Sequence, residues 1–350
     1  MSTTPPEQHQ RRPRYSGTHP RRFSEKYKEH DPEKYPETIG KILASGKTPA
    51  GSHRPICLQE ILEILAPRPG ETAVDATLGY GGHAAEILKK ILPGGRLFGL
   101  DVDPFELPKT EARLRDAAIP PEALIVSQTN FAGLPRLLAA HGVSGVDLVL
   151  ADLGCSSMQF DNPQRGFSFK VDGPLDLRMN PHKGQSAAAL LGSMDEARLS
   201  DILAENADEP HAHRIAQSIL QAQARSPIQT TRALTVAVRT ALASLPKQIQ
   251  QQEGDTPVRR VFQALRIAVN EEFTALEMFL RFLPMCLNPG ARVAILTFHS
   301  GEDRRVKKAF QAGLREKTYA SIAPDVIRPS DEEIRANPRS SSAKLRWAIG

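Results

Sequence analysis

From Arg54 onward, short runs of β-forming residues alternate with amphipathic helical stretches. A chain with this alternation forms a parallel sheet whose crossover helices cover both faces. Four strands are expected at Thr72–Ala76, Arg96–Asp101, Leu124–Ser127 and Asp147–Asp152, and four helices at Leu58–Leu65, Gly82–Leu92, Glu106–Ala117 and Phe131–His141. These units predict an α/β fold with a Rossmann-like, doubly wound and mostly parallel sheet.

The alternation stops at Gly154, where loops are followed by helical segments. The expected helices are Ala187–Ala207, Ala212–Ala222 and Arg232–Ser244. An amphipathic helix with Arg266 off its apolar stripe begins after Pro257, and β-rich runs at Arg292–Phe298 and Lys344–Ile349 resume the sheet. We therefore predict one Rossmann-like domain, residues 52–153 and 258–350, that is interrupted by an all-helical insertion over residues 154–257.

Residues 1–51 contain seven prolines among charged and polar residues, a composition typical of a disordered arm. Basic residues between Arg11 and Lys28 are interleaved with Tyr15, Phe23 and Tyr27, which fits a segment that contacts nucleic acid. A plain solubilising tail is the alternative. The formal net charge of +5 is compatible with a polyanionic partner without requiring one.

Several classes of protein do not fit the composition. No apolar run approaches the roughly 20 residues of a membrane helix, so no membrane partner is expected. The three cysteines are far apart and form no CxxC pair, which argues against disulfides and a cysteine-built zinc site. The His211-x-His213 pair has no further ligands at metal spacing. A cytoplasmic protein without a metal is expected.

A glycine loop, residues 79–83, closes the first expected strand and opens a helix, and the second strand ends at Asp101. A carboxylate at that place can accept hydrogen bonds from both ribose hydroxyls of a nucleoside cofactor. S-adenosylmethionine and nicotinamide dinucleotides both use this layout. The loop lacks the G-x-G-x-x-G order, and Asp75 in the first strand suits a cationic ligand better than phosphates, so the pattern favours S-adenosylmethionine.

Two side chains at the ends of later strands are candidates for contact with the substrate. Asp152 ends the fourth strand and could accept hydrogen bonds from an amine; its alternative role is to cap the following turn. His299 ends the fifth strand and could hydrogen-bond a target base; its alternative role is to hold the loop between strand and helix. Both are predicted as catalytic residues.

Long motifs in this sequence resemble the ribosomal RNA small subunit methyltransferase H family. The resemblance runs from about His53 to Ala348. The motifs are Gly79-Tyr80-Gly81-Gly82-His83, Asp101-Val102-Asp103-Pro104, Asp152-Leu153-Gly154-Cys155-Ser156-Ser157, Arg165-Gly166-Phe167-Ser168-Phe169, Asp172-Gly173-Pro174-Leu175-Asp176-Leu177-Arg178-Met179, Phe262-Gln263-Ala264-Leu265-Arg266-Ile267-Ala268-Val269-Asn270, Phe298-His299-Ser300-Gly301-Glu302-Asp303-Arg304 and Asn337-Pro338-Arg339.

The resemblance implies a class I methyltransferase that transfers methyl from S-adenosylmethionine to the exocyclic N4 of a cytidine in the decoding region of 16S rRNA. The RNA or the small ribosomal subunit would be its partner, and an oligomer is allowed. The resemblance also assigns a set of residues to the cofactor: Gly81, Gly82, His83, Asp101, Phe131, Asp152 and Gln159. Phe131 would lie beside adenine.

The inserted region is then expected to face the RNA. Arg165, Lys170, Arg178 and Lys183 are predicted to meet phosphates, with a solvated loop as the alternative. Cys155 and Ser156 stand where DNA amino-methyltransferases have a stacking aromatic, so stacking would need an aromatic from the following loop. The candidates are Phe160, Phe167 and Phe169.

The sequence also departs from the family pattern. The basic arm is not typical, Asn206–His211 replaces an aromatic followed by Gly-Glu-Glu, and Gly301 stands where leucine is common. These differences leave open a paralogue that methylates another RNA cytidine. A nicotinamide-dependent oxidoreductase and a catalytically silent ribosome-assembly factor are the remaining alternatives.

Overall fold

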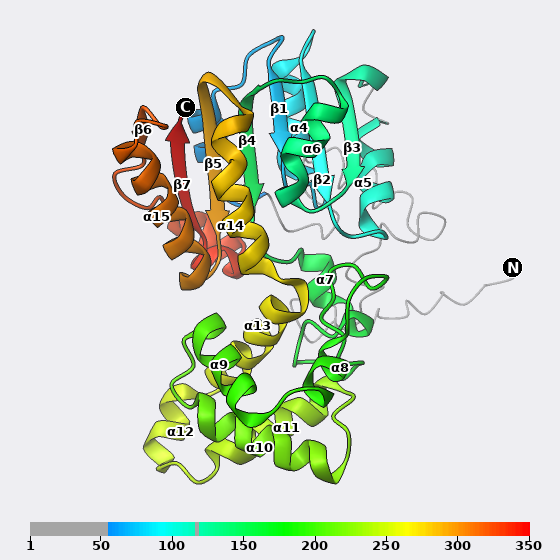
Figure 1. Ribbon diagram of the computed structural model, residues 1–350, viewed down its shortest axis with the longest axis vertical. Coiled ribbons are helices and arrows are strands. Elements are labelled where there is room, and N and C mark those ends of the chain that lie inside the picture. The colour runs from blue at the N-terminus through cyan, green and yellow to red at the C-terminus, as the bar shows by residue number, and fades with distance from the viewer. Residues whose placement is uncertain (1–54, 116–118) are drawn as a thin grey trace, which may run out of the picture. The chain divides into compact units, whose positions relative to one another are not determined.

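A seven-stranded sheet in the order β3-β2-β1-β4-β5-β7-β6 forms the centre of the α/β part (Figure 1). The computed structural model describes residues 55–115 and 119–350, and the predicted arm lies outside this part. The strands are β1 Thr72–Asp75, β2 Arg96–Asp101, β3 Leu124–Gln128, β4 Val146–Asp152, β5 Leu287–Thr297, β6 Ser321–Ile322 and β7 Lys344–Ile349. The predicted doubly wound α/β fold is confirmed.

The pairing of the strands places β1 at the point where the strand order reverses. β1 lies parallel to β2 on one side, with Asp75 beside Gly99, and parallel to β4 on the other, with Asp75 beside Leu150. β7 is antiparallel to both β5 and β6. Ligands of doubly wound sheets bind beyond the carboxyl ends of the strands at this reversal, so the candidate crevice lies at the ends of β1, β2 and β4.

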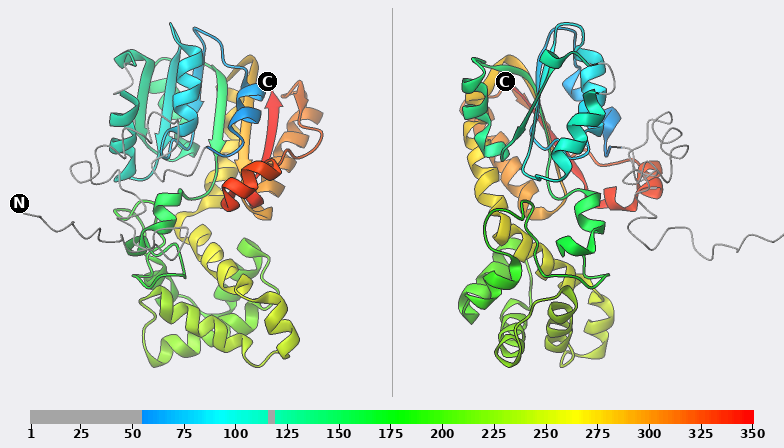
Figure 2. Two further views of the ribbon diagram at one scale, coloured as in Figure 1. Left: turned by 180° about the vertical axis from the view of Figure 1, so that it is seen from behind. Right: turned by 90° about the vertical axis from the view of Figure 1, so that its right-hand side faces the viewer.

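Alternating residues of the strands pack into two separate cores, one on each face of the sheet. Ala73, Leu97 and Leu148 pack with helices α3 Leu58–Leu65, α4 Gly82–Ile91 and α5 Glu106–Arg115. Val74 and Val149 face the opposite way, toward helices α6 Leu134–Ala140, α14 Glu272–Phe282 and α15 Ser300–Arg315. Figure 2 shows helices on both faces, as a parallel sheet requires.

The insertion forms a helical lobe with a hydrophobic core of its own. Its helices are α8 Ala187–Gly192, α9 Glu196–Ala207, α10 Ala212–Arg225, α11 Thr231–Leu242, α12 Lys247–Glu253 and α13 Thr256–Asn270. The helical segment predicted near Ala187–Ala207 is divided into two helices, because Asp195 accepts a hydrogen bond from the Arg198 N–H (2.8 Å) and thereby caps a new helix, α9.

The predicted boundary at residue 257 separates α13 from the helices with which it packs. Val258, Val261 and Leu265 of α13 are buried in the core of the lobe. Figure 1 shows α13 among the lobe helices and α14 beside β5. We therefore propose that the lobe ends at Asn270, where Glu271 adopts φ 51° between the two helices.

Short elements complete the described part: α7 Ser157–Asp161, α16 Asp331–Ala336, η2 Pro121–Ala123, η3 Phe131–Gly133, η4 Pro163–Arg165, η5 Leu283–Cys286 and η6 Pro338–Ser342. Among the residues described, no helix has the length and apolar character needed to span a bilayer.

Candidate functional site

The loop after β1 is tied to the strands on either side of it. The Thr77 hydroxyl accepts a hydrogen bond from the Asp152 N–H (2.6 Å), and the Leu78 N–H donates to the Leu100 carbonyl (2.7 Å). Gly81 then begins α4 with φ 79°, and a Cβ at this position would lie 2.9 Å from Thr110 Cγ2. Glycine is required at position 81 both by this conformation and by the close packing.

Asp101 at the end of β2 is oriented by two backbone groups. Its Oδ2 accepts from the Gly79 N–H (2.8 Å) and its Oδ1 from the Asp103 N–H (2.9 Å). Burial raises the pKa of Asp101, while these hydrogen bonds oppose the rise. Each carboxylate oxygen retains a lone pair, so Asp101 can accept hydrogen bonds from a vicinal diol such as that of ribose.

Two further carboxyl groups lie at the ends of β1 and β4 without a cation beside them in the part of the chain described. Burial, opposed by the Thr77 N–H, raises the pKa of Asp75 to about 7. Burial and the neighbouring Asp75 and Glu302 raise the pKa of Asp152 to about 8. A concentration of carboxyl groups that resist ionisation fits a ligand that carries positive charge, as the sulfonium and ammonium of S-adenosylmethionine do.

His83 contacts Asp152 from the first turn of α4. Its Nε2 lies 3.0 Å from the Ile56 carbonyl oxygen, so Nε2 carries the proton, and Nδ1 lies 3.8 Å from Asp152 Oδ2. Burial lowers the pKa of His83 to about 4. The imidazole is therefore neutral at pH 7 and adds no charge to the crevice.

Phe131 and Gln159 occupy different surroundings. Phe131 begins η3, beyond β3, and its ring packs edge-on against Phe279 with a centroid distance of 5.3 Å. Gln159 in α7 is 7% exposed, and its Nε2 donates a hydrogen bond to Oδ2 of Asp103 (2.8 Å). Asp103 follows Asp101 by two residues. Their contact with a cofactor stays a prediction; the amide of Gln159 would act through Asp103 and the loop that holds Asp101.

Two residues predicted to contact RNA have internal roles instead. Arg165 is 9% exposed and donates from Nη1 to Asp103 Oδ2 (2.8 Å) and from Nη2 to the Met179 carbonyl (2.7 Å), so its guanidinium is not free for a phosphate. Phe167 is 3% exposed in the lobe core and cannot stack on a base. These two predictions are wrong because both side chains pack inward.

The other predicted RNA contacts lie at the surface or near it. Lys170 and Lys183 are exposed and have no ion-pair partner within 4.0 Å among the described residues. Arg178 is about one-fifth exposed and binds both carboxylate oxygens of Asp176, from Nε (2.7 Å) and Nη2 (2.8 Å). The two lysines therefore remain the better candidates for phosphate contact.

His299 lies at the start of α15 and turns toward a buried ionic cluster. Its Nε2 is 3.2 Å from Glu302 Oε1, and its side chain is 11% exposed. Glu272 lies in the same cluster and receives both a Nε–H and a Nη2–H hydrogen bond from Arg266 (2.8 and 2.9 Å). The guanidinium also donates to Cys155 Sγ (3.4 Å), directly beyond Asp152. Base contact by His299 stays a prediction.

Reasoning from sequence missed both Asp103 and Arg266. Asp103 is 1% exposed and accepts from Gln159, Arg165 and the Phe105 N–H, so it organises the loop after β2. The sequence signal for Asp103 was its place as the second acidic residue of the motif Asp101-Val102-Asp103-Pro104. Arg266 lies off the apolar stripe of α13, yet its side chain is buried against Glu272.

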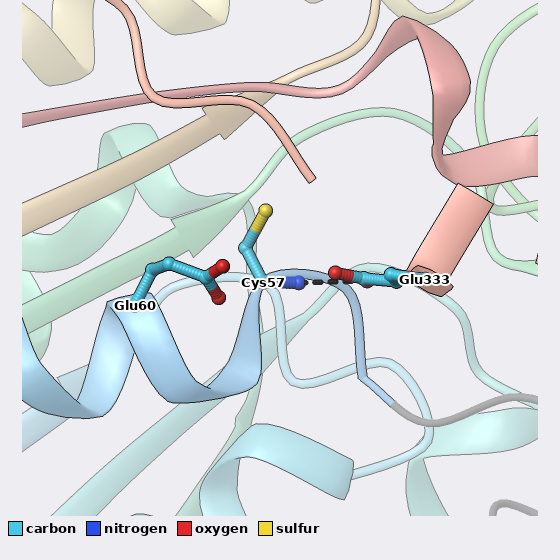
Figure 3. Close-up of side chains that lie close together, drawn as sticks. All are labelled: Cys57, Glu60 and Glu333. Atoms are coloured by element: carbon cyan, nitrogen blue, oxygen red, sulfur yellow. Dashed lines mark hydrogen bonds between the residues drawn. The ribbon is translucent and has the colours of Figure 1, made fainter. Parts of the chain in front are cut away.

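Two groups of three potential metal ligands occur in the described residues. In the first, Glu272, His299 and Glu302, the Arg266 guanidinium already supplies positive charge. Figure 3 shows the second, Cys57, Glu60 and Glu333, in which the Cys57 N–H donates to Glu333 Oε1 (2.9 Å). Burial and both carboxylates raise the pKa of Cys57 to about 12, so its thiol holds its proton at neutral pH.

The sheet order, the glycine loop at the strand reversal and the carboxylate on β2 define a class I S-adenosylmethionine-dependent methyltransferase. Residues 50–349 match the model of the MraW methylase family. The chain belongs to this family.

Curated relatives cover nearly the whole chain. The chain is 51% identical over 344 residues to ribosomal RNA small subunit methyltransferase H 2 of Alkaliphilus metalliredigens, covering 98% of each. It is 50% identical to ribosomal RNA small subunit methyltransferase H 1 of Lachnoclostridium phytofermentans over 97% of this chain and 93% of the relative. Ribosomal RNA small subunit methyltransferase H of Symbiobacterium thermophilum is 41% identical over 85% of this chain and 96% of its own.

The relatives differ in how much of this chain they cover. An alignment over 344 of 350 residues includes most of the arm, so relatives that share it exist. The Symbiobacterium thermophilum relative covers 85% of this chain and so leaves 15% of it unmatched. The arm thus varies within the family and is not peculiar to this chain.

Asp101→Asn should weaken the binding of S-adenosylmethionine about 10- to 100-fold, because one oxygen of the ribose-binding carboxylate becomes an N–H donor. The new amide would also face the N–H of Gly79 or Asp103. Calorimetric titration with S-adenosylhomocysteine measures the loss, and Asp325→Asn, at an exposed carboxylate beyond β6, is the control. Equal affinity for Asp101→Asn and the wild type would place the ribose elsewhere.

Proposed function

We propose that this methylase transfers methyl from S-adenosylmethionine to the exocyclic N4 of a cytidine in small-subunit rRNA, within the 16S decoding region. The named activity of relatives at about 50% identity over nearly the full chain supports the RNA class. The single structural observation that carries the proposal is the cluster of Asp75, Asp101 and Asp152 at the ends of three adjacent strands. The N4 position follows from the resemblance of the motifs.

Asp152 is the proposed catalytic residue. When bound, the donor supplies an activated methyl group on a sulfonium leaving group. Asp152 accepts a hydrogen bond from the N4 amine and so helps its lone pair leave conjugation with the ring. The N4–C bond forms as the S–C bond breaks, with the electron pair passing to sulfur. Asp152 takes the proton from N4 as the new N–C bond forms, a role that its raised pKa favours.

Alignment of nitrogen, methyl and sulfur provides much of the rate in such a displacement. The chain orients its part of this geometry through the backbone: Thr77 accepts from the Asp152 N–H, and Gly79 donates to Asp101. Membership of a methylase family decides against the nicotinamide-dependent alternative. A silent assembly factor would have no use for three carboxylates held in this way.

The decisive experiment is nucleoside mass spectrometry of small-subunit rRNA after incubation with the purified protein and S-adenosylmethionine. We expect N4-methylcytidine at one position in RNA from cells that lack the gene, and mapping that position separates the proposed substrate from another RNA cytidine. Confirmed donor binding with no N4-methylcytidine in the RNA or the assembled subunit would overturn the proposal.

Donor binding should release protons near neutral pH. Asp75 and Asp152 hold protons below pH 7 to 8 in the free protein, and a bound cation lowers their pKa, so protons leave. The observed affinity for S-adenosylmethionine should then rise by up to about tenfold per pH unit for each proton released between pH 6 and 8. Calorimetry in two buffers of different ionisation enthalpy counts the protons. Asp152→Asn should release fewer, and equal release would contradict this assignment.

A further inference from the structure

One exposed aromatic side chain stands at the edge of the crevice where the α/β domain meets the lobe. Phe105 follows Asp101 by four residues, and 47% of its surface is exposed. Six large apolar side chains of the described residues are exposed to a similar degree, and Phe105 is the aromatic one among them. Its ring lies 5.4 Å from the ring of His182, which comes from the lobe and is also exposed.

Hydrogen bonds fix the backbone of both residues. The Phe105 N–H donates to Asp103 Oδ1 (2.9 Å), and Asp103 is the buried partner of Arg165, whose guanidinium carbon lies 5.9 Å from the centre of the Phe105 ring. The His182 N–H donates to Asn180 Oδ1 (3.0 Å). A surface that is already ordered loses little conformational entropy when a ligand binds.

Positive charge is available beside this pair. Lys183 follows His182 directly, is exposed and has no ion-pair partner within 4.0 Å among the described residues. Arg178 binds Asp176 and donates from Nη1 to the Gly184 carbonyl (3.3 Å), which closes the loop that carries His182 and Lys183. An aromatic face next to a free cation is the combination that binds unpaired nucleotides, since the ring stacks on a base and the cation meets the phosphate.

We propose that Phe105, with His182 and Lys183, forms a stacking platform for an unpaired nucleotide of the RNA substrate next to the one being methylated. The inference rests on the proposed function, because it assumes that the target base enters the crevice at Asp152. Phe105 lies on the loop after β2, at the same edge of the sheet as the end of β4 that carries Asp152, so a strand bound along this edge can reach the ring. The platform supplies the aromatic contact that buried Phe167 does not.

Truncation of the ring tests the platform. Phe105→Ala should raise the KM for small-subunit rRNA about 5- to 100-fold, the range for loss of one base–aromatic stack, and leave the affinity for S-adenosylhomocysteine within twofold. Phe105→Tyr keeps the ring and should retain wild-type KM. Met285→Ala is the control for loss of an exposed apolar side chain, since Met285 is 74% exposed on η5.

A fluorescence experiment tests stacking without any methyl transfer. Trp347 is the single tryptophan, so F105W in a W347F background carries one indole, at the platform. Addition of an unpaired RNA oligonucleotide should quench its emission, and Lys183→Ala should weaken the quenching and its dependence on salt. Failure of the wild type to methylate rRNA would overturn the proposed function, whereas quenching would still support the platform.

Three results would overturn the platform. The first is an unchanged KM for rRNA in Phe105→Ala from an active wild type. The second is a loss of donor affinity in that variant, which would assign the ring to the cofactor. The third is the absence of quenching by RNA. Each leaves the assignment of Asp152 and Asp101 untouched.

Discussion

Asp152→Asn should lower kcat about 10²- to 10⁴-fold, the usual range for losing a general base. The asparagine keeps the size of the side chain and an oxygen that accepts a hydrogen bond from the amine, but it cannot take the proton from N4 as the N–C bond forms. Single-turnover methylation of small-subunit rRNA with saturating donor measures the chemical step. Asp325→Asn, at an exposed carboxylate beyond β6, is the control.

The same substitution should stabilise the fold, which separates a catalytic loss from a folding defect. The pKa of Asp152 is about 8 in the folded protein against an ordinary value of 3.8, so the folded state binds more protons than the unfolded state between these values. The free energy of unfolding of the wild type therefore falls as pH rises through this window. Because asparagine does not ionise, the Asp152→Asn variant does not lose this stability. The gain in thermal midpoint should be larger at pH 8 than at pH 5. A variant with full kcat, or one that melts earlier at pH 8, would contradict the assignment.

Much of the α/β domain was predictable because strand burial on two faces and glycine loops are local signals. β2 and β7 begin and end where the pattern of residues predicts, and β1, β3 and β4 differ by one residue at an end. α14 and α15 were not predicted. Their apolar residues, such as Phe279 and Phe310, pack on a face of the sheet that assembles only after distant strands have paired.

The cofactor side of the site was also predictable, since a carboxylate at a strand end is placed by the sheet itself. The RNA side was not. Arg165 lies in a loop, and its inward direction depends on Asp103, which is 62 residues away along the chain. Charge and motif alone cannot separate a cation that meets solvent from one that a distant carboxylate draws inside.

Two of the departures from the family pattern, Asn206–His211 and Gly301, fall where the lobe touches the α/β domain. Asp208 stands in the stretch that differs, adopts φ 50°, and binds Ser300 Oγ (2.8 Å) and Arg304 (3.0 Å from Nη1 and from Nη2) at the start of α15. A Cβ at Gly301 would lie 2.5 Å from Phe273 Cζ, so glycine leaves room for this ring. These differences alter a packing contact between domain and lobe, and they leave the carboxylates of the crevice in place.

Glu272→Gln should destabilise the protein by about 3 kcal/mol, because it leaves the buried Arg266 guanidinium without its carboxylate. The side chains of Arg266 and Glu272 are only 13% and 12% exposed, and two hydrogen bonds join them. Urea unfolding followed by circular dichroism measures the change. Glu277→Gln, later in the same helix, is the matched control. The side chain of Glu277 is 60% exposed, so its ion pair with Arg305 should contribute less than about 1 kcal/mol to the free energy of unfolding.

Replacing both partners of the Arg266–Glu272 ion pair separates the cost of an unpaired buried charge from the cost of the lost contact. Arg266→Met combined with Glu272→Met removes the unpaired guanidinium and should recover most of the stability that Glu272→Gln loses, since well-packed apolar residues often replace a buried ion pair without cost. The pair lies where the lobe helix α13 gives way to α14, and the guanidinium reaches Cys155 beside Asp152. The double variant should therefore fold yet remain less active, because the lobe loses the ionic contact that sets its position at the crevice. Wild-type activity in that variant would show that apolar packing alone positions the lobe.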